Sequence, residues 1–123
     1  MKLIDRVQTA IANATMPTAP ELPPRIEFWW EAHNSPSDLK WVSCFSGHEA
    51  VQVAAWLLPY TLWEQFAQGL KLDEITDYPA TYDSLRSRNR WFFYRMCCSR
   101  ATIEGQNLWE VLTLDQRMKP CEN

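Results

Sequence analysis

Two neighbouring segments with a strict two-residue alternation of side chains constrain the fold of this chain most. In residues 25–32, one side of an extended strand is apolar and the other side is mixed. The two sides are Ile26, Phe28 and Trp30 against Glu27, Trp29 and Glu31. Residues 39–45 repeat the alternation after HNSPSD at 33–38, a segment rich in turn-forming residues. The pattern predicts an antiparallel β-hairpin.

A capping pattern and an apolar run follow the hairpin and predict a helix. Ser46 and Glu49 have the spacing of a capping box, in which the serine hydroxyl accepts from the backbone of Glu49 while the Glu49 side chain reaches back to the backbone of Ser46. The apolar residues that follow predict a helix over 49–58. Pro59 ends or kinks this helix because it has no backbone N–H.

The same type of pattern predicts a second helix directly after the proline. Thr61 and Glu64 repeat the capping-box spacing. Apolar side chains then recur every four residues on one face, at Leu62, Phe66 and Leu70. We therefore expect a helix over 61–70, and the segment 69–73, which begins with a glycine, breaks the pattern.

Arginine and aromatic side chains are concentrated in segment 83–104, which has no acidic residue between its two ends. The arginines are Arg86, Arg88, Arg90, Arg95 and Arg100, and the aromatic run is Trp91, Phe92, Phe93 and Tyr94. We expect a turn or short helix over 78–88. For 90–98 we predict a strand because aromatic residues favour strands, although the length also permits a helix. A turn at 105–107 and an alternating segment at 108–114 complete a predicted second hairpin.

The rest of the chain divides into short flanking segments around one core. Residues 1–16 place apolar side chains at helical spacing and predict an N-terminal amphipathic helix. Residues 17–24 contain four prolines and predict an extended, Pro-rich connector, and residues 119–123 form a C-terminal tail. The predicted core, 25–118, is a single α+β domain in which a four-stranded, mostly antiparallel sheet from two hairpins packs on two to three helices.

Composition argues against several classes of function. The net charge of −3 is not that of a protein held on nucleic acid by bulk charge. No apolar stretch approaches the roughly 20 residues that span a bilayer, so we expect no membrane partner. The cysteines lack C-x-x-C spacing, so we expect buried free thiols, no metal site and no cofactor. They are Cys44, Cys97, Cys98 and Cys121. No signal-peptide pattern precedes them, and we expect a reducing, cytoplasmic location.

A catalytic site is the third hypothesis for this chain. Cys44 precedes His48 by four residues, which is the nearest arrangement to a nucleophile and its base. Against it, Glu49 already has a role in the helix cap, and a histidine in the first turn of a helix is commonly solvated. The three glycines are far apart, so no phosphate-binding loop is formed. We expect no catalytic residue and a protein that is not an enzyme.

The leading hypothesis is a non-enzymatic protein-interaction module. Its expected binding residues are Trp29, Arg88, Arg90, Trp91 and Arg95. Tryptophan and arginine are enriched among the interface residues that contribute most to binding. A short, tryptophan-rich chain without a catalytic signature is typical of small bacterial or phage regulators and inhibitors that bind a larger assembly. We therefore expect a protein partner.

Three alternatives stay open at this point. Segment 86–100 is an alternative surface for single-stranded DNA or RNA, because arginines hold phosphates and aromatic rings stack on bases. The same aromatic residues belong to the core if the arginines instead pair with acidic residues before the segment. Those acidic residues are Asp73, Asp77 and Asp83. An exposed tryptophan patch also fits a homodimer interface.

Overall fold

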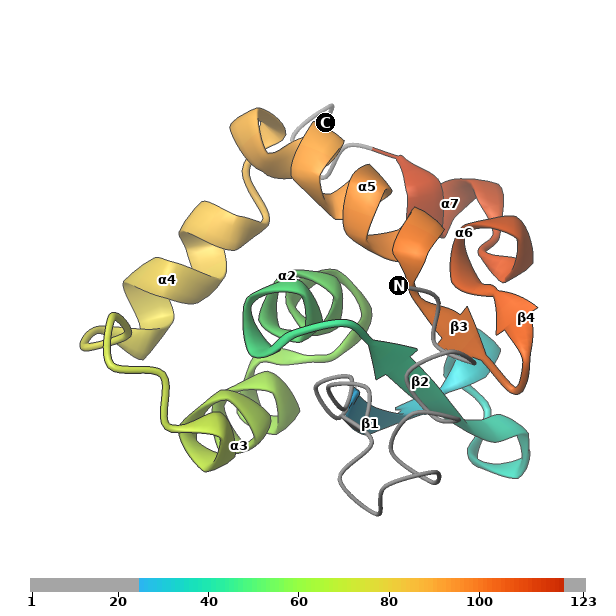
Figure 1. The fold of residues 1–123 in the computed structure, drawn as a ribbon, viewed down its shortest axis with the longest axis horizontal. Coiled ribbons are helices and arrows are strands. Elements are labelled where there is room, and N and C mark those ends of the chain that lie inside the picture. Colours follow the sequence, from blue (N-terminus) through green and yellow to red (C-terminus); the bar gives the residue numbers. More distant parts are fainter. Residues whose placement is uncertain (1–24, 119–123) are drawn as a thin grey trace, which may run out of the picture.

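A central helix, α2 (Gly47–Leu57), organises the fold that the computed structural model describes over residues 25–118. Residues 50–55 of this helix are all buried, because the helix is covered on every side. Figure 1 shows α2 in the middle, with α3, α4, α5 and the sheet around it. The predicted helix at 1–16, the connector at 17–24 and the tail at 119–123 lie outside the described residues.

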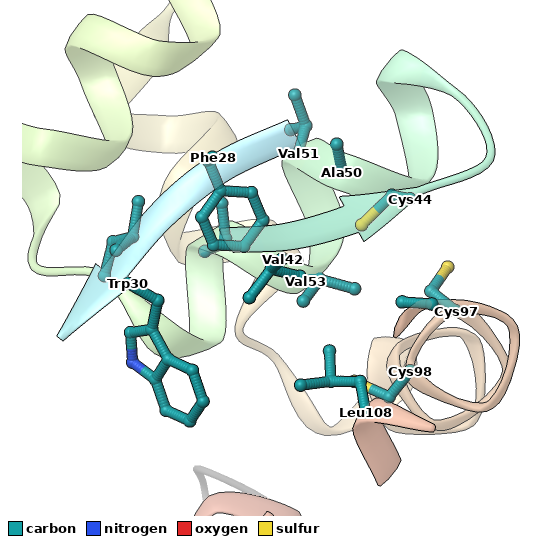
Figure 2. Close-up of a cluster of buried hydrophobic side chains, with 14 of the residues drawn as sticks. Phe28, Trp30, Val42, Cys44, Ala50, Val51, Val53, Cys97, Cys98 and Leu108 are labelled. Atoms are coloured by element: carbon teal, nitrogen blue, oxygen red, sulfur yellow. The ribbon is translucent and has the colours of Figure 1, made fainter. Parts of the chain in front are cut away.

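The predicted first hairpin is confirmed. β1 (Ile26–Glu31) pairs antiparallel with β2 (Leu39–Cys44). Two 3-10 turns, η1 (Ala32–Asn34) and η2 (Pro36–Asp38), join the strands. On the inner side of the hairpin, two side chains of each strand are buried and lie near side chains of α2 and α5 (Figure 2), whereas Ile26 and Lys40 on this side are partly buried. The buried residues are Phe28, Trp30, Val42 and Cys44.

A second, much shorter hairpin completes the predicted four-stranded antiparallel sheet, in the order β1-β2-β3-β4. Its strands are β3 (Thr102–Ile103) and β4 (Gln106–Asn107). Glu104 and Gly105 between them have positive φ values of 48° and 82°, which a two-residue hairpin turn requires. The predicted α+β class with two hairpins is thus confirmed, although the second hairpin contributes few residues.

Two segments predicted as strands are helices instead. Segment 108–114 forms α6 (Leu108–Val111) and leads into α7 (Leu114–Arg117). The side chain of Asn107 accepts a hydrogen bond from the backbone N–H of Glu110, and this cap starts α6 where the strand would have continued. Segment 90–98 lies largely within α5 (Trp91–Arg100).

The helical state of α5 is explained by which side chains it buries. Tyr94, Cys97 and Cys98 are fully buried, and their i, i+3 and i+4 spacing places them on one helical face. A strand would have placed the adjacent cysteines on opposite sides. The helix turns both into the core, where Cys98 lies beside Leu108 and Cys97 lies on the side toward Cys44 (Figure 2), while α5 contacts the central helix. Aromatic preference for strands is weak and yields to such tertiary packing.

The capping predictions for the two central helices have different outcomes. The Ser46 hydroxyl accepts from the backbone N–H of Glu49, as predicted, but the Glu49 carboxylate accepts from Arg100. The second helix, α3 (Tyr60–Leu70), begins one residue earlier than predicted, and its N-cap is Pro59 instead of Thr61.

The buried face of α3 also differs from the predicted one. Trp63 and Ala67 are fully buried, whereas Leu62 is 48% exposed. The indole N–H of Trp63 donates to the backbone oxygen of Val51, so this tryptophan anchors α3 to α2. The expected short helix over 78–88 is confirmed as α4 (Tyr78–Leu85).

Candidate interaction surfaces

The outer side of the first hairpin carries a pair of exposed tryptophans. The register places Trp29 of β1 opposite Trp41 of β2, and their ring centroids lie 4.0 Å apart. Trp29 is 49% exposed and Trp41 is 42% exposed. Leu39, which is 48% exposed, extends this apolar area toward the loop. We call Trp29, Leu39 and Trp41 the tryptophan face.

The exposure of these side chains follows from the alternation along both strands. Phe28 and Trp30 point into the core, and each is 4% exposed. Since successive side chains of a strand alternate in direction, this burial turns Trp29 outward. Contiguous exposed apolar patches are uncommon on soluble monomers and mark interaction sites when they occur. The tryptophan face is therefore a candidate site.

An apolar groove adjoins the tryptophan face along the outer edge of β1. The groove has a volume of about 570 Å³, with residues 28–31 of β1 on one wall and Leu62 and Phe66 of α3 on the other. Successive side chains of β1 point to opposite sides of the sheet, yet residues 28–31 all line the groove. The groove therefore runs along the edge of the strand. β1 is the first strand of the sheet, and no strand among residues 25–118 pairs with its outer edge. We call this feature the edge groove.

Acidic side chains surround the tryptophan face. Glu27 and Glu31 are exposed on the same side of β1 as Trp29. Lys40, at the loop end of the hairpin, lies 3.2 Å from the carboxylate of Asp38 and 3.4 Å from that of Glu104. Both hydrogen bonds, that to Asp38 first, raise the pKa of Lys40. The positive charge of Lys40 is therefore already matched. At the other end of the face, Arg25 donates a hydrogen bond to the side chain of Ser43, which pairs with Glu27, so the acidic residues of the face have a basic neighbour there.

A second group of aromatic side chains lies where α5 meets the C-terminal part of the described chain. Arg95 lies over the rings of Trp91 and Trp109, at 5.8 Å and 5.7 Å from their centroids. Arg117 lies 5.1 Å from the Trp109 ring and donates to the backbone oxygen of Trp109. The indole N–H of Trp91 donates to the backbone oxygen of Arg117. We call Trp91, Arg95, Trp109 and Arg117 the arginine cluster.

Two other arginines of the sequence segment have structural contacts. Arg86 donates to the backbone oxygen of Ala55 at 2.8 Å, and Arg100 pairs with Glu49 at 3.0 Å. Asp77, one of the acidic residues considered as an arginine partner, instead caps α4 by accepting from the backbone of Ala80. Part of the segment thus belongs to the framework of the fold, through contacts that differ from those predicted.

The structure separates Trp29 from the other four predicted binding residues. Arg88 and Arg90 form the short turn η3 (Arg88–Arg90), and Trp91 and Arg95 follow on α5. Figure 1 shows the start of α5 on the opposite side of the molecule from β1. The three arginines are exposed, whereas Trp91 is half-buried. The five residues therefore do not form one surface.

Sequence reasoning missed three residues of the candidate site, Leu39, Trp41 and Leu62. For Trp41 the signal was incomplete, because a hairpin closed by the turn at 33–38 would place Trp41 opposite Trp30, whereas the observed register pairs Glu31 with Leu39 and so places Trp41 opposite Trp29. For Leu62 there was no signal, because Leu62, Phe66 and Leu70 form the apolar face of the predicted helix, and that face was expected to be buried. Only the packing of α3 decides that Trp63 is buried and Leu62 lines the groove.

Cys44 and His48, the residues of the hypothetical catalytic site, do not line a shared pocket. Cys44 is 1% exposed, and burial, with a smaller effect from Glu49, raises the pKa of its thiol to about 12. His48 is exposed and pairs with Glu74. The cavity that His48 lines does not include Cys44 among its lining residues. A thiolate at Cys44 is therefore strongly disfavoured near neutral pH.

Comparisons with protein-family models, curated proteins and solved structures gave no significant match. Within residues 25–118, no group of three or more metal-ligating side chains is close enough to hold an ion. No helix in this same range has the length and apolar character needed to cross a bilayer. The function of the protein is therefore inferred from the geometry of its surfaces.

Proposed function

We propose that this protein is a non-enzymatic protein-interaction module that contacts a larger partner through the tryptophan face and the edge groove. The observation that carries the proposal is the exposed pair of Trp29 and Trp41, whose rings are in contact, next to an apolar groove. Tryptophan side chains supply a large contact area with little loss of conformational freedom, and they dominate binding energy where they become buried.

The shape and position of the edge groove favour a partner that binds through an extended segment of its chain. An edge strand offers backbone N–H and C=O groups to an added strand, and the pockets beside it select apolar side chains. β1 has this position in the sheet, and the edge groove runs along it. Glu27 and Glu31 favour basic residues at the rim of the partner. A regulator or inhibitor of an assembly would use such a surface to occupy a site on its target.

The buried thiols support a reducing, cytoplasmic setting for this interaction. Cys44, Cys97 and Cys98 are free and buried. Burial raises the pKa of Cys97 to about 12, as it does for Cys44. Cysteines of this kind act as small apolar core residues, and the fold of the described region does not depend on a disulfide among them.

The exposed face of α5 gives a second candidate function, binding of single-stranded DNA or RNA. Phe92, Arg95 and Met96 lie on one helical face, and Phe92 is 69% exposed. An exposed ring beside an arginine can stack on a base while the guanidinium contacts a phosphate. Arg88 lies in the turn that precedes α5 and is also exposed. The net charge of −3 argues against this candidate.

Affinity capture with matched variants tests the first proposal. The tagged full-length chain is incubated with lysate of its source organism, with and without nuclease, beside the double variants Trp29→Ser/Trp41→Ser and Phe92→Ser/Met96→Ser. Both variants remove two exposed apolar side chains, from the tryptophan face and from α5 respectively. We expect a stoichiometric protein partner that the first variant loses and the second retains, with unchanged circular dichroism in both.

The other outcomes decide between the alternatives. Loss of the partner in the α5 variant alone would contradict the tryptophan-face proposal. Capture that nuclease abolishes would favour the nucleic-acid function, and the affinity should then fall steeply with added salt. If the unmodified chain sediments as a dimer and the tryptophan variant as a monomer, the face is instead a homodimer interface.

A further inference from the structure

A second cavity, of about 440 Å³, lies among α2, the connection after α3, α4 and the start of α5. It shares no lining residue with the edge groove. Small-molecule sites in proteins typically have volumes of about 300–1,000 Å³ and combine an apolar lining with a few polar groups. The size of this cavity is therefore that of a ligand site. We call it the His48 cavity.

The lining of the His48 cavity has an apolar part and a polar part. Val51, Leu72 and Phe93 supply apolar surface from three different elements. His48, Glu74 and Arg90 supply the ionisable groups. An occupant that matches both parts is amphiphilic, with an apolar body and one polar head. The sign of the charges then decides which kind of head group fits.

The acidic group of the cavity is already satisfied. The Glu74 carboxylate accepts hydrogen bonds from its own backbone amide and from His48, and these two interactions, in that order, lower the pKa of Glu74. The carboxylate is thus anionic at neutral pH and has partners in the fold. A cationic ligand head would have to compete with His48 for it.

The basic group of the cavity is Arg90, and unlike Glu74 its side chain has no hydrogen-bond or ion-pair partner among residues 25–118. Arg90 is also exposed. Guanidinium is always charged at physiological pH and binds carboxylate or phosphate oxygens through two parallel N–H donors. Arg90 is therefore the group of the His48 cavity that is available to hold an anion.

We propose that the His48 cavity binds a small amphiphilic anion, an alkyl or aryl carboxylate or phosphate monoester, with its charged head on Arg90 and its apolar body against Val51, Leu72 and Phe93. The hydroxyls of Thr81 and Ser84 also line the cavity and can donate further hydrogen bonds to the head group. This site is independent of the tryptophan face, so the protein would carry a small-molecule site in addition to its partner surface.

Titrations of the full-length protein with four eight-carbon probes, followed by ¹H–¹⁵N NMR, test the proposal. Sodium octanoate and octyl phosphate carry anionic heads, octan-1-ol a neutral head and octylamine a cationic head. We expect the two anions to shift resonances around the cavity, and octylamine to bind most weakly. The relative affinities of octanoate and octyl phosphate identify the preferred head group.

Two matched substitutions sharpen the test. Arg90→Gln should weaken octanoate binding by about tenfold or more, since hydrogen bonds to charged groups are the stronger ones, and should leave octan-1-ol unchanged. Arg88→Gln is the control, because Arg88 belongs to the same exposed turn but does not line the cavity. Ser84→Phe, which places a ring in the cavity, should abolish binding of all probes, with the dispersion of the NMR spectrum showing that the fold is kept.

Several results would overturn the proposal. Equal losses in the Arg88 and Arg90 variants would show general charge attraction in place of a site. Equal affinity for octanoate and octan-1-ol would remove the role of Arg90. Shifts confined to the tryptophan face and edge groove, or no shifts at all, would show that the His48 cavity does not accept such ligands.

Discussion

The tryptophan face and the arginine cluster each contain two neighbouring tryptophans, yet their surroundings differ. The ring centroids are 4.0 Å apart for Trp29 and Trp41 and 6.2 Å apart for Trp91 and Trp109. In the cluster, arginines lie over both rings, and the Trp91 indole N–H has a backbone acceptor. Within the described chain, no hydrogen bond satisfies the indole N–H of Trp29 or of Trp41. Tryptophan content alone therefore does not locate a binding surface.

The two tryptophan pairs differ in the structural elements that they connect. The cluster joins α5 to the C-terminal helices, because Trp91 and Tyr94 of α5 both donate to backbone oxygens of α7. The tryptophan face joins two strands that are already paired through their backbones. We infer that the cluster tryptophans stabilise the fold, and we propose that the face tryptophans bind a partner. The following predictions test this contrast.

The largest expected effect is on the free energy of unfolding of the Trp91→Ala variant. Loss of a half-buried indole and of its hydrogen bond to Arg117 should lower this free energy by about 2–3 kcal/mol. The matched change on the exposed pair, Trp41→Ala, should cost less than about 1 kcal/mol. Urea unfolding followed by far-ultraviolet circular dichroism measures both. Equal costs would remove the distinction between the two regions.

A smaller loss is expected for Tyr94→Phe. Its hydroxyl donates to the backbone oxygen of Gln116 at 2.8 Å, and the ring, fully buried, stacks on Trp56. The substitution keeps the stacking but removes the donor, so the free energy of unfolding should fall by about 1–2 kcal/mol. Tyr78→Phe, which removes a hydroxyl from α4, serves as the control in the same unfolding experiment. If the two variants are equally stable, the α5–α7 hydrogen bond does not contribute.

Substitution of Arg117 should have a milder effect that depends on the side chain chosen. Arg117→Ala removes both the contact with the Trp109 ring and the hydrogen bond to its backbone, which should cost about 1 kcal/mol. Arg117→Lys keeps the charge but lacks the planar guanidinium, so it should recover only part of this stability. Thermal unfolding of the two variants separates charge from geometry. Full recovery by lysine would show that charge alone is needed.

The smallest expected effect is a pH dependence in the loop beside the tryptophan face. Hydrogen bonds from Lys40, and then from His33, lower the pKa of Asp38 below its usual value of 3.8. The ionised carboxylate therefore stabilises the fold above pH 3.8, and this contribution is lost as the pH falls through the folded-state pKa. An NMR titration of the Asp38 carboxyl should give a midpoint below 3.8 that Lys40→Met moves upward. An unchanged midpoint in that variant would contradict the assigned cause.

The first hairpin was predictable because its information is local. Alternation at 25–32 and 39–45 and a turn-forming segment between them predict the two strands and their antiparallel pairing without reference to the rest of the chain. The observed register differs by one residue from that implied by a turn at 33–38, because Glu31 and not Ala32 pairs with Leu39. The exposed position of Trp29 follows from that alternation once Phe28 and Trp30 are placed inside. The His48 cavity was not predictable, because its lining residues come from segments far apart in the sequence.

The sequence by itself determined the α+β class, the first hairpin and the helix that starts after Ser46, because each depends on neighbours within a few residues. Only the tertiary structure decided that residues 91–100 are helical and that Trp91 is half-buried. The acceptor for the Trp91 indole is the backbone oxygen of Arg117, 26 residues later in the chain. The partial burial of Trp91 depends on this distant contact, which no local pattern encodes.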